Sequence, residues 1–95
     1  MSALVFSVNI HDQATYAEYR RRIAPVMERH GVTIRAEFEV GSTISSVSDD
    51  GRANRLAVFL FPTDAAQDAF FEDPAYVAAK PLLLASTDNV QRLVP

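Results

Sequence analysis

The chain has 95 residues, 48% of them hydrophobic and 22% charged, which is the composition of one globular domain. Its formal net charge of −3 disfavours a surface for nucleic acid, because phosphate-binding surfaces are normally basic. The absence of cysteine excludes disulfides, thiolate catalysis and zinc–thiolate sites. We expect a single domain over residues 1–95.

The first twelve residues, MSALVFSVNIHD, predict a strand. Their alternate side chains form two sets, Leu4, Phe6, Val8, Ile10 and Ala3, Val5, Ser7, Asn9. The segment has no basic start and its apolar run ends at Ile10, so it is too short for a signal peptide or a membrane-spanning helix. We therefore expect a cytoplasmic protein that does not enter a membrane.

A helix is predicted after Asp12, which is a good N-cap residue. Side chains at three- and four-residue steps then form one stripe, Tyr16, Tyr19, Ile23, Val26, Met27 and His30. Gly31 is expected to end the helix, because glycine tolerates a positive φ. Pro25 removes a backbone donor inside the helix, so we expect a kink or a split there.

Two strands are predicted next, at residues 32–40 and 55–61, with turn signals between them at residues 41–54. Thr63 or Asp64 is expected to cap a second helix. Asp73 and Pro74 begin a short third helix that Pro81 interrupts. A turn at residues 86–89 and a last strand at residues 90–94 complete the chain.

The order of these elements predicts a ferredoxin-like α+β fold, a four-stranded antiparallel sheet with helices on one face. Crossover connections are right-handed, so both helical segments lie on the same side of the sheet and its other face is bare. Apolar side chains on a bare face form an interaction surface. A second copy of the chain is the simplest cover, because most oligomers are two-fold dimers.

The third strand is apolar at every position from 56 to 61, so both of its faces require burial. The set that we assign to the helix side is Leu56, Val58 and Leu60. The set that we assign to the bare side is Ala57, Phe59 and Phe61. The two phenylalanine rings of the second set favour association with another copy, since each ring buries a large apolar area when it is covered.

Three segments carry a resemblance to a known family: YAEYRRRIAPVMERHG at 16–31, NRLAVFLFP at 54–62 and AFFEDPAYVAAKP at 69–81. Over nearly its whole length the chain resembles the dimeric α+β barrel superfamily. Within it, the chain resembles the bacterial family of domains of unknown function numbered thirteen-thirty. The resemblance implies a homodimer whose two sheets face each other across a barrel-like interior. It does not imply one activity, because the same fold serves many functions.

Better-known members of the superfamily include cofactor-free monooxygenases, haem-degrading monooxygenases, muconolactone isomerases and stress-responsive proteins. Haem-degrading relatives use a helix histidine, typically in the second half of the chain, and this chain has no histidine from Ala57 onward. No cofactor is therefore expected. Many family members carry an arginine soon after the position of Pro81, where this chain has Leu82, Leu83 and Leu84. That departure argues against a ligand anion at this point.

If the bare side of the sheet encloses an interior between two copies, side chains from several strands converge there. The expected ligand-binding residues are Ser7, Arg35, Arg55, Phe59, Phe61 and Tyr76. An apolar hollow with a few polar groups is typical of a site for a small organic molecule. The alternative is a packed dimer interface with Arg–Glu pairs at its rim.

Three residues are candidates for catalysis in the same interior. Glu37 is a candidate general base if desolvation raises its pKa, whereas pairing with Arg35 or Arg55 would lower that pKa. Asn9 is a candidate to stabilise an oxyanion, or else to form an Asx turn. His11 is a candidate base at the mouth of the cavity, or else an exposed loop residue. No metal site is predicted, because the two histidines lack the spacing of a metal pair.

Two functions of different classes follow. The first is a small-molecule-binding homodimer that acts as a cofactor-free monooxygenase or isomerase. In it, Glu37 or His11 takes a proton, and Asn9 or Arg55 stabilises the oxyanion. The second is a non-catalytic binding or stress-related homodimer with a packed interface and no substrate.

Overall fold

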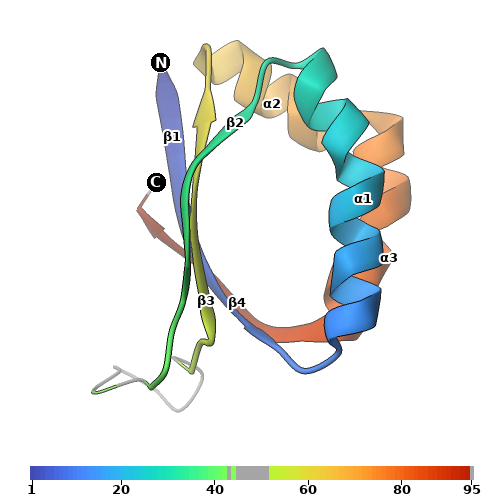
Figure 1. Ribbon diagram of the computed structural model, residues 1–95. Helices are drawn as coiled ribbons and strands as arrows, with labels where there is room; N and C mark the ends of the chain where they lie inside the picture. Colours follow the sequence, from blue (N-terminus) through green and yellow to red (C-terminus); the bar gives the residue numbers. More distant parts are fainter. Residues whose placement is uncertain (43, 45–51, 95) are drawn as a thin grey trace.

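The computed structural model describes residues 1–42, 44 and 52–94. Its elements are β1 (Ser2–Ile10), α1 (Gln13–Arg29), β2 (Thr33–Glu39), β3 (Arg55–Phe61), α2 (Asp64–Glu72), α3 (Pro74–Ser86) and β4 (Thr87–Val94). Figure 1 shows the sheet on one side of the molecule and the helices on the other. The predicted α+β fold, with helices on one face of an antiparallel sheet, is confirmed.

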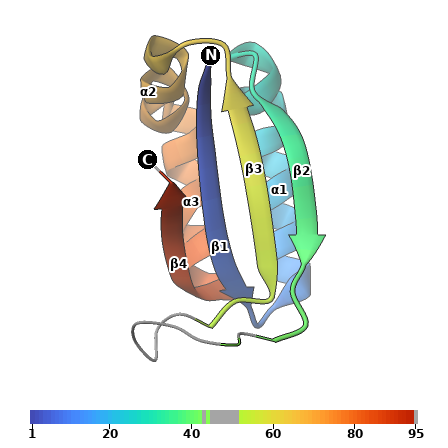
Figure 2. The same ribbon diagram turned by 90° about the vertical axis from the view of Figure 1, so that its left-hand side faces the viewer.

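The sheet has the strand order β2-β3-β1-β4, and every neighbouring pair is antiparallel. The two central strands are β1 and β3, so β2 and β4 form the edges, as Figure 2 shows with the helices behind the sheet. Phe59 of β3 lies opposite Leu4 of β1, and Val58 lies opposite Val5. Side chains of opposite residues share a face, so this register determines what each face carries.

Helix α1 begins and ends with the caps that the sequence predicts. The Asp12 carboxylate accepts hydrogen bonds from the backbone N–H of Thr15 at 3.1 Å and from its hydroxyl at 2.7 Å. At the other end Gly31 has φ +69°, its N–H donates to the carbonyl of Glu28 at 3.2 Å, and the N–H of Val32 donates to that of Met27 at 2.8 Å. These bonds form a Schellman motif, which satisfies carbonyls that the helix leaves without partners.

Helix α1 is continuous through Pro25, so the chain does not split there. Ile23 and Val26, on either side of the proline, are fully buried, whereas Pro25 itself is exposed. Burial of the flanking side chains offsets the single backbone hydrogen bond that proline removes.

Helix α3 begins as predicted, but it ends later than predicted. Asp73 caps it by accepting from the N–H of Ala75 at 2.9 Å, and Pro74 is its first residue. The expected interruption at Pro81 is wrong, because the helix runs to Ser86 and β4 starts directly at Thr87. The predicted turn at residues 86–89 is wrong for the same reason.

Two hydroxyl groups stabilise this abrupt junction. The hydroxyl of Ser86 donates to the carbonyl of Leu82 at 2.7 Å, and that of Thr87 donates to the carbonyl of Leu83 at 2.6 Å. Both residues are buried. The last turn of the helix therefore has partners for its carbonyls without a separate turn segment.

A charged cluster joins the end of α1 to the start of α3. The Asp73 carboxylate accepts from Arg29 Nη1 at 2.6 Å and from His30 Nε2 at 2.8 Å, and its side chain is 8% exposed. The hydrogen bond from His30, together with those from Ala75 and Arg29, lowers the pKa of Asp73 to about 2. The carboxylate is thus ionised at neutral pH and holds two helix ends together.

The predicted assignment of β3 side chains to the two faces of the sheet is wrong. Ala57, Phe59 and Phe61 are 0%, 4% and 1% exposed and lie beneath the helices. The ring of Phe61 packs against Phe70 and Phe71 of α2, with centroids 5.9 and 6.0 Å away. Because both sets of this strand are apolar, their two-residue period carries no information about which set faces the helices.

The face of the sheet that lacks helices is apolar as well. Leu56, Val58 and Leu60 lie there, half-buried, since they alternate with the buried set. Phe38 of β2 lies opposite Leu56 and is 54% exposed. We call the surface formed by Val5, Phe38, Leu56, Val58 and Leu60 the open face. The prediction of one bare face is therefore confirmed, but with the other set of β3 side chains.

Candidate anion-binding site

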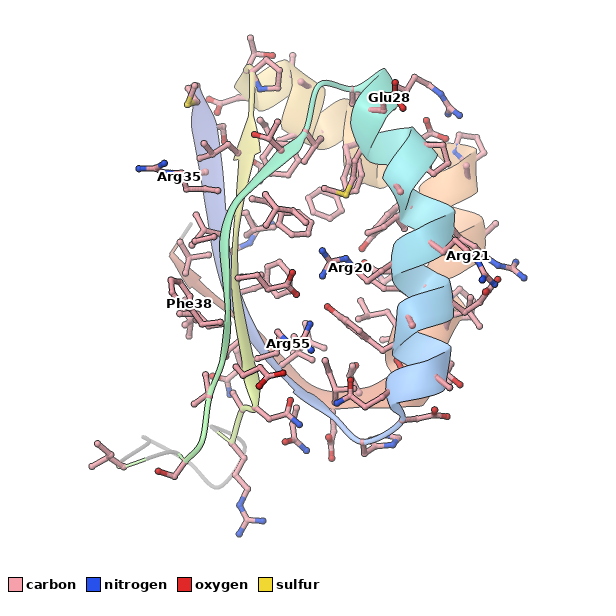
Figure 3. All side chains as sticks on the ribbon, viewed as in Figure 1. Arg20, Arg21, Glu28, Arg35, Phe38 and Arg55 are labelled. Carbon is pink, nitrogen blue, oxygen red and sulfur yellow. The ribbon has the colours of Figure 1, made fainter. Side chains whose placement is uncertain are left out.

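Two arginines meet one glutamate between the sheet and α1. Tyr16 and Arg20 are four residues apart, so they lie on the same side of α1. Glu37 lies opposite Ala57, which places it on the helix side of the sheet, and Arg55 is the first residue of β3. In Figure 3 the side chains of Arg20 and Arg55 both point into the space between the sheet and the helix.

The Glu37 carboxylate accepts hydrogen bonds from both arginines. Arg20 binds it with two nitrogens, Nη1 to Oε2 at 2.8 Å and Nη2 to Oε1 at 3.2 Å, and Arg55 Nη1 reaches Oε2 at 2.7 Å. The side chains of Arg20, Arg55 and Glu37 are 20%, 20% and 25% exposed. These three side chains therefore bring two positive charges and one negative charge to a partly buried position, so the three together carry one net positive charge.

Aromatic rings surround these charges. The guanidinium carbon of Arg20 lies 5.9 Å from the centre of the Tyr16 ring and 5.7 Å from that of Phe59. Arg55 lies 5.6 Å from the Tyr16 ring, and Arg20 Nη1 also donates to the Tyr16 hydroxyl at 3.3 Å. These distances suit cation–π attraction, which orients each guanidinium. We call Tyr16, Arg20, Glu37, Arg55 and Phe59 the arginine cluster.

The pKa of Glu37 is shifted down, not up. Burial raises the pKa of its carboxyl, but the hydrogen bonds and charges of Arg20 and Arg55 outweigh burial and lower it. Sequence analysis left two possibilities for Glu37, a raised pKa through desolvation or a lowered pKa through pairing with arginine. The structure shows the pairing with arginine. The partners of Glu37 are Arg55, as expected, and Arg20, which the sequence reasoning did not include.

Arg35 does not take part in the cluster. Figure 3 shows its side chain pointing away from the helices, on the same side of the sheet as Phe38. The pairing of β2 with β3 shifts register between Ile34 and Ala36, so one extra residue of β2 is accommodated there. The expectation that Arg35 and Glu37 share a face is wrong for this reason.

Asn9 and His11, two of the three candidate catalytic residues, lie outside the arginine cluster. The side-chain amide of Asn9 donates to Asp88 of β4 at 3.1 Å, on the side of β1 away from β3. His11 is exposed, and its backbone N–H donates to the carbonyl of Ser86 at 3.0 Å. The structure therefore brings together Glu37, Arg55 and Phe59, but not the full predicted set.

The remaining predicted ligand residues lie in two other places, the open side of the sheet and the aromatic packing against α2. Ser7 is 7% exposed and lies opposite Leu56, on the open side of the sheet. Phe61 belongs to the aromatic packing against α2. Tyr76 is buried in the same ring cluster, with ring centres 4.9 and 5.1 Å from those of Phe70 and Phe71, and it also lies beside Tyr19 at 6.5 Å. These three residues do not share one hollow.

Sequence reasoning missed Tyr16 and Arg20 as members of the site. The run Arg20-Arg21-Arg22 looks like a solvated helix surface, and Arg21 and Arg22 are indeed exposed and paired with Glu18. Arg20 lies four residues after Tyr16 of the buried stripe, on the side of the sheet. This four-residue spacing is the feature of the sequence that could have identified Arg20 as part of the site.

Metal ligands and membrane-spanning helices are not found in the part of the chain that the structure describes. Over residues 1–42, 44 and 52–94, no three His, Asp or Glu side chains are placed to hold a metal ion. In the same residues, no helix combines the length and the apolar character needed to cross a bilayer.

Comparison with known proteins places the chain in a family. The model of a domain of unknown function, DUF1330, matches residues 3–95. The chain belongs to the DUF1330 family. No curated protein is significantly similar to it in sequence. Family membership therefore comes without an assigned activity.

Solved structures share the fold of this DUF1330 domain. A protein of unknown function from Rhodopseudomonas palustris has a TM-score of 0.79 and 21% identity over 98% of this chain and 80% of its own. A dimeric ferredoxin-like protein of unknown function from Jannaschia has a TM-score of 0.61 and 17% identity over 99% of this chain and 100% of its own. A hypothetical protein from Arabidopsis thaliana has a TM-score of 0.61 and 16% identity over 96% and 82%. At these identities the likeness shows the ferredoxin-like fold.

Proposed function

We propose that this DUF1330 domain is a homodimeric binding protein for a small organic anion, which Arg20 and Arg55 hold. The observation that supports the proposal is the surplus of one positive charge in the partly buried arginine cluster. A charge held away from water is costly without a partner. A ligand carboxylate beside Arg55 supplies that partner, because Arg55 uses Nη1 for Glu37 and a guanidinium has five N–H donors.

The surroundings of the two arginines favour a flat, apolar body behind the anionic group. Tyr16 and Phe59 present ring surfaces next to the guanidinium groups, and Phe6 extends this surface with its ring centre 5.1 Å from that of Phe59. Small-molecule sites usually combine such apolar walls with a few polar groups that fix orientation. A small carboxylic acid with an unsaturated or aromatic body fits this chemistry.

The same geometry supports binding rather than proton transfer. Both Glu37 oxygens accept hydrogen bonds from arginine, and the lowered pKa makes this carboxylate a weak base. A cofactor-free monooxygenase or isomerase step would need a base that this cluster does not supply. We therefore propose a binding function and not a reaction.

The homodimer that we propose uses the open face. Half-buried leucine and valine side chains and the exposed ring of Phe38 form an apolar surface of the kind that marks an interface. The dimeric relative from Jannaschia supports an assembly of two copies. The interface and the ligand site then use opposite faces of the sheet, so a packed interface and a bound ligand are compatible in one molecule.

Calorimetry with matched pairs of ligands tests the binding proposal. Acetate, benzoate and phenylacetate are titrated at low salt, each beside its neutral amide. We expect benzoate and phenylacetate to bind and their amides not to bind. Arg55→Met should weaken benzoate roughly tenfold or more, the usual effect of losing a charged hydrogen bond.

Arg22→Met is the matched control for this experiment. Arg22 lies on the same helix as Arg20 but is 58% exposed and pairs with Glu18. We expect this variant to bind benzoate as the unchanged protein does. Binding of amides as tightly as acids, or equal loss of affinity in both arginine variants, would contradict a site at the arginine cluster.

A further inference from the structure

Two buried tyrosines form a second polar group next to the arginine cluster. Tyr19 of α1 and Tyr76 of α3 are each 6% exposed, and their hydroxyl oxygens are 3.5 Å apart. This separation is long for an O–H···O hydrogen bond, which is usually below about 3.0 Å. Among the described residues, neither hydroxyl has another hydrogen-bond partner.

The hydrogen-bonding capacity of this pair is incompletely used. Each phenol has one proton to donate, and within a pair only one of the two protons can point at the other oxygen. Whichever hydroxyl donates, the proton of the other has no acceptor among the described side chains. Buried polar groups almost always have partners, so this proton calls for an acceptor from outside the chain.

Both phenols remain donors at ordinary pH. Burial raises the pKa of Tyr19, and the neighbouring Tyr76 raises it further. Burial also raises the pKa of Tyr76, although its hydrogen bond with Tyr19 acts in the opposite direction. A neutral phenol that keeps its proton prefers an oxygen acceptor.

The tyrosine pair and the arginine cluster are connected by ring contacts. The Tyr19 ring centre lies 5.8 Å from that of Tyr16, and the Tyr16 hydroxyl accepts from Arg20. The Tyr76 ring lies 6.5 Å beyond, in an edge-to-face arrangement with Tyr19. An aromatic surface thus leads from the guanidinium groups of the cluster to the hydroxyl pair.

We propose that the Tyr19–Tyr76 pair binds an oxygen acceptor at the far end of the ligand. The ligand class is then a small aromatic acid that carries a phenol or carbonyl oxygen opposite its carboxylate. This inference rests on the proposed function, because the carboxylate end is held by Arg20 and Arg55. It adds a second point of contact with the ligand, and therefore a preference for acids that carry an oxygen at the far end.

Three benzoates differing at one position test this proposal by calorimetry. Benzoate, 4-methylbenzoate and 4-hydroxybenzoate are titrated into the full chain, and the methyl group controls for the size of the hydroxyl. We expect 4-hydroxybenzoate to bind roughly three- to tenfold more tightly than 4-methylbenzoate, the gain from one neutral hydrogen bond. Tyr76→Phe should remove this gain and leave the affinity for benzoate nearly unchanged.

Tyr16→Phe is the matched variant at the other end of the ligand. It should weaken all three benzoates by a similar factor, so the preference for the hydroxyl remains. The ratio of two dissociation constants within one variant does not depend on how much of the protein is folded. Tyr19→Phe gives the same test if Tyr76→Phe folds poorly.

The outcomes separate this inference from the proposed function. If no benzoate binds, the anion site itself fails and the inference fails with it. If benzoate binds but the hydroxyl brings no gain, or the gain survives Tyr76→Phe and Tyr19→Phe, only the inference is overturned. The second result would mean that the hydroxyl pair has water or nothing as its partner.

Discussion

Gly31 connects the end of α1 to the start of β2 at a point where a larger residue has no room. Its φ of +69° is one that other residues rarely adopt, and an added Cβ would lie 2.9 Å from Cγ of Pro62. The backbone conformation and the contact with Pro62 both disfavour any residue with a Cβ at this position. The conformation alone costs a residue with a Cβ about 1–2 kcal/mol.

We predict that Gly31→Ala lowers the free energy of unfolding by at least about 1–2 kcal/mol, measured by urea denaturation. Gly41→Ala is the control, because a Cβ at Gly41 meets no atom within 4 Å. It should change the free energy of unfolding by less than about 0.5 kcal/mol. Equal effects at the two glycines would show that neither the positive φ nor Pro62 matters.

For single residues, the sequence predicts helix caps better than it predicts site residues. Asp12, Gly31 and Asp73 act as expected, because capping depends on chemistry within a few residues. Arg35 was misplaced because a register shift at positions 34–36 puts it on the other face, and no residue type marks that shift. Arg20 was missed because its role depends on Glu37, which is far along the chain.

Asp73 lies where three helices meet. It follows the last residue of α2, caps α3, and accepts hydrogen bonds from Arg29 and His30 at the end of α1. Its pKa is lowered from 3.8 to about 2, so the folded state favours the ionised form. The resulting stabilisation is present above the pKa of the unfolded chain and is lost as the pH falls from about 4 to about 2.

Asp73→Asn keeps an oxygen for the cap and removes the charge. We predict a variant that melts a few degrees below the unchanged protein at pH 7, with a gap that closes as the pH falls from 4 to 2. Melting temperatures followed by circular dichroism across this range measure the gap. A gap of constant size would mean that the ionisation of Asp73 does not contribute to the contact between the helices.

Among the elements, those with a clear period were predicted, whereas the effect of a proline inside a helix was not. The buried stripe of α1 and the alternation of β1 predict the bounds of both elements closely. The sequence predicts an interruption of α3 at Pro81, but Pro81 is exposed, and Leu83 and Ser86 beyond it are buried. The helix continues beyond Pro81 because these side chains are buried by tertiary packing. A rule based only on the proline and its sequence neighbours does not include that packing.

The proposed assembly of two copies concerns the whole molecule. Val58 lies on the central strand β3 in the open face, whereas Val77 of α3 is 55% exposed on the opposite side of the molecule. We predict that the unchanged protein sediments as a dimer at micromolar concentration. Val58→Asp should weaken the dimer at least tenfold, because it buries a charge at the interface.

Val77→Asp is the matched control and should leave the dimer intact. Circular dichroism shows whether each variant is folded, and analytical ultracentrifugation gives the oligomeric state. A monomer at micromolar concentration for the unchanged protein, or dimers for both variants, would remove the open face as the interface.

The fold as a whole could be predicted, but the side of the sheet on which each set of β3 side chains lies could not. The order of strands and helices, with right-handed crossovers, is enough for one sheet with one bare face. Which β3 side chains face the helices depends on the register of β3 with β1 and on the packing of Phe59 and Phe61 beneath the helices. The candidate ligand site moved with that choice, from the space between two copies to the space within one.

Strand β3 contributes to both functions through alternate residues. Arg55 and Phe59 belong to the proposed anion site, and Leu56, Val58 and Leu60 belong to the open face, the proposed surface for a second chain. Under these two proposals, we expect a substitution in one set of β3 side chains to alter ligand preference or self-association separately. One strand would then allow the ligand to change while the pairing of two copies stays the same.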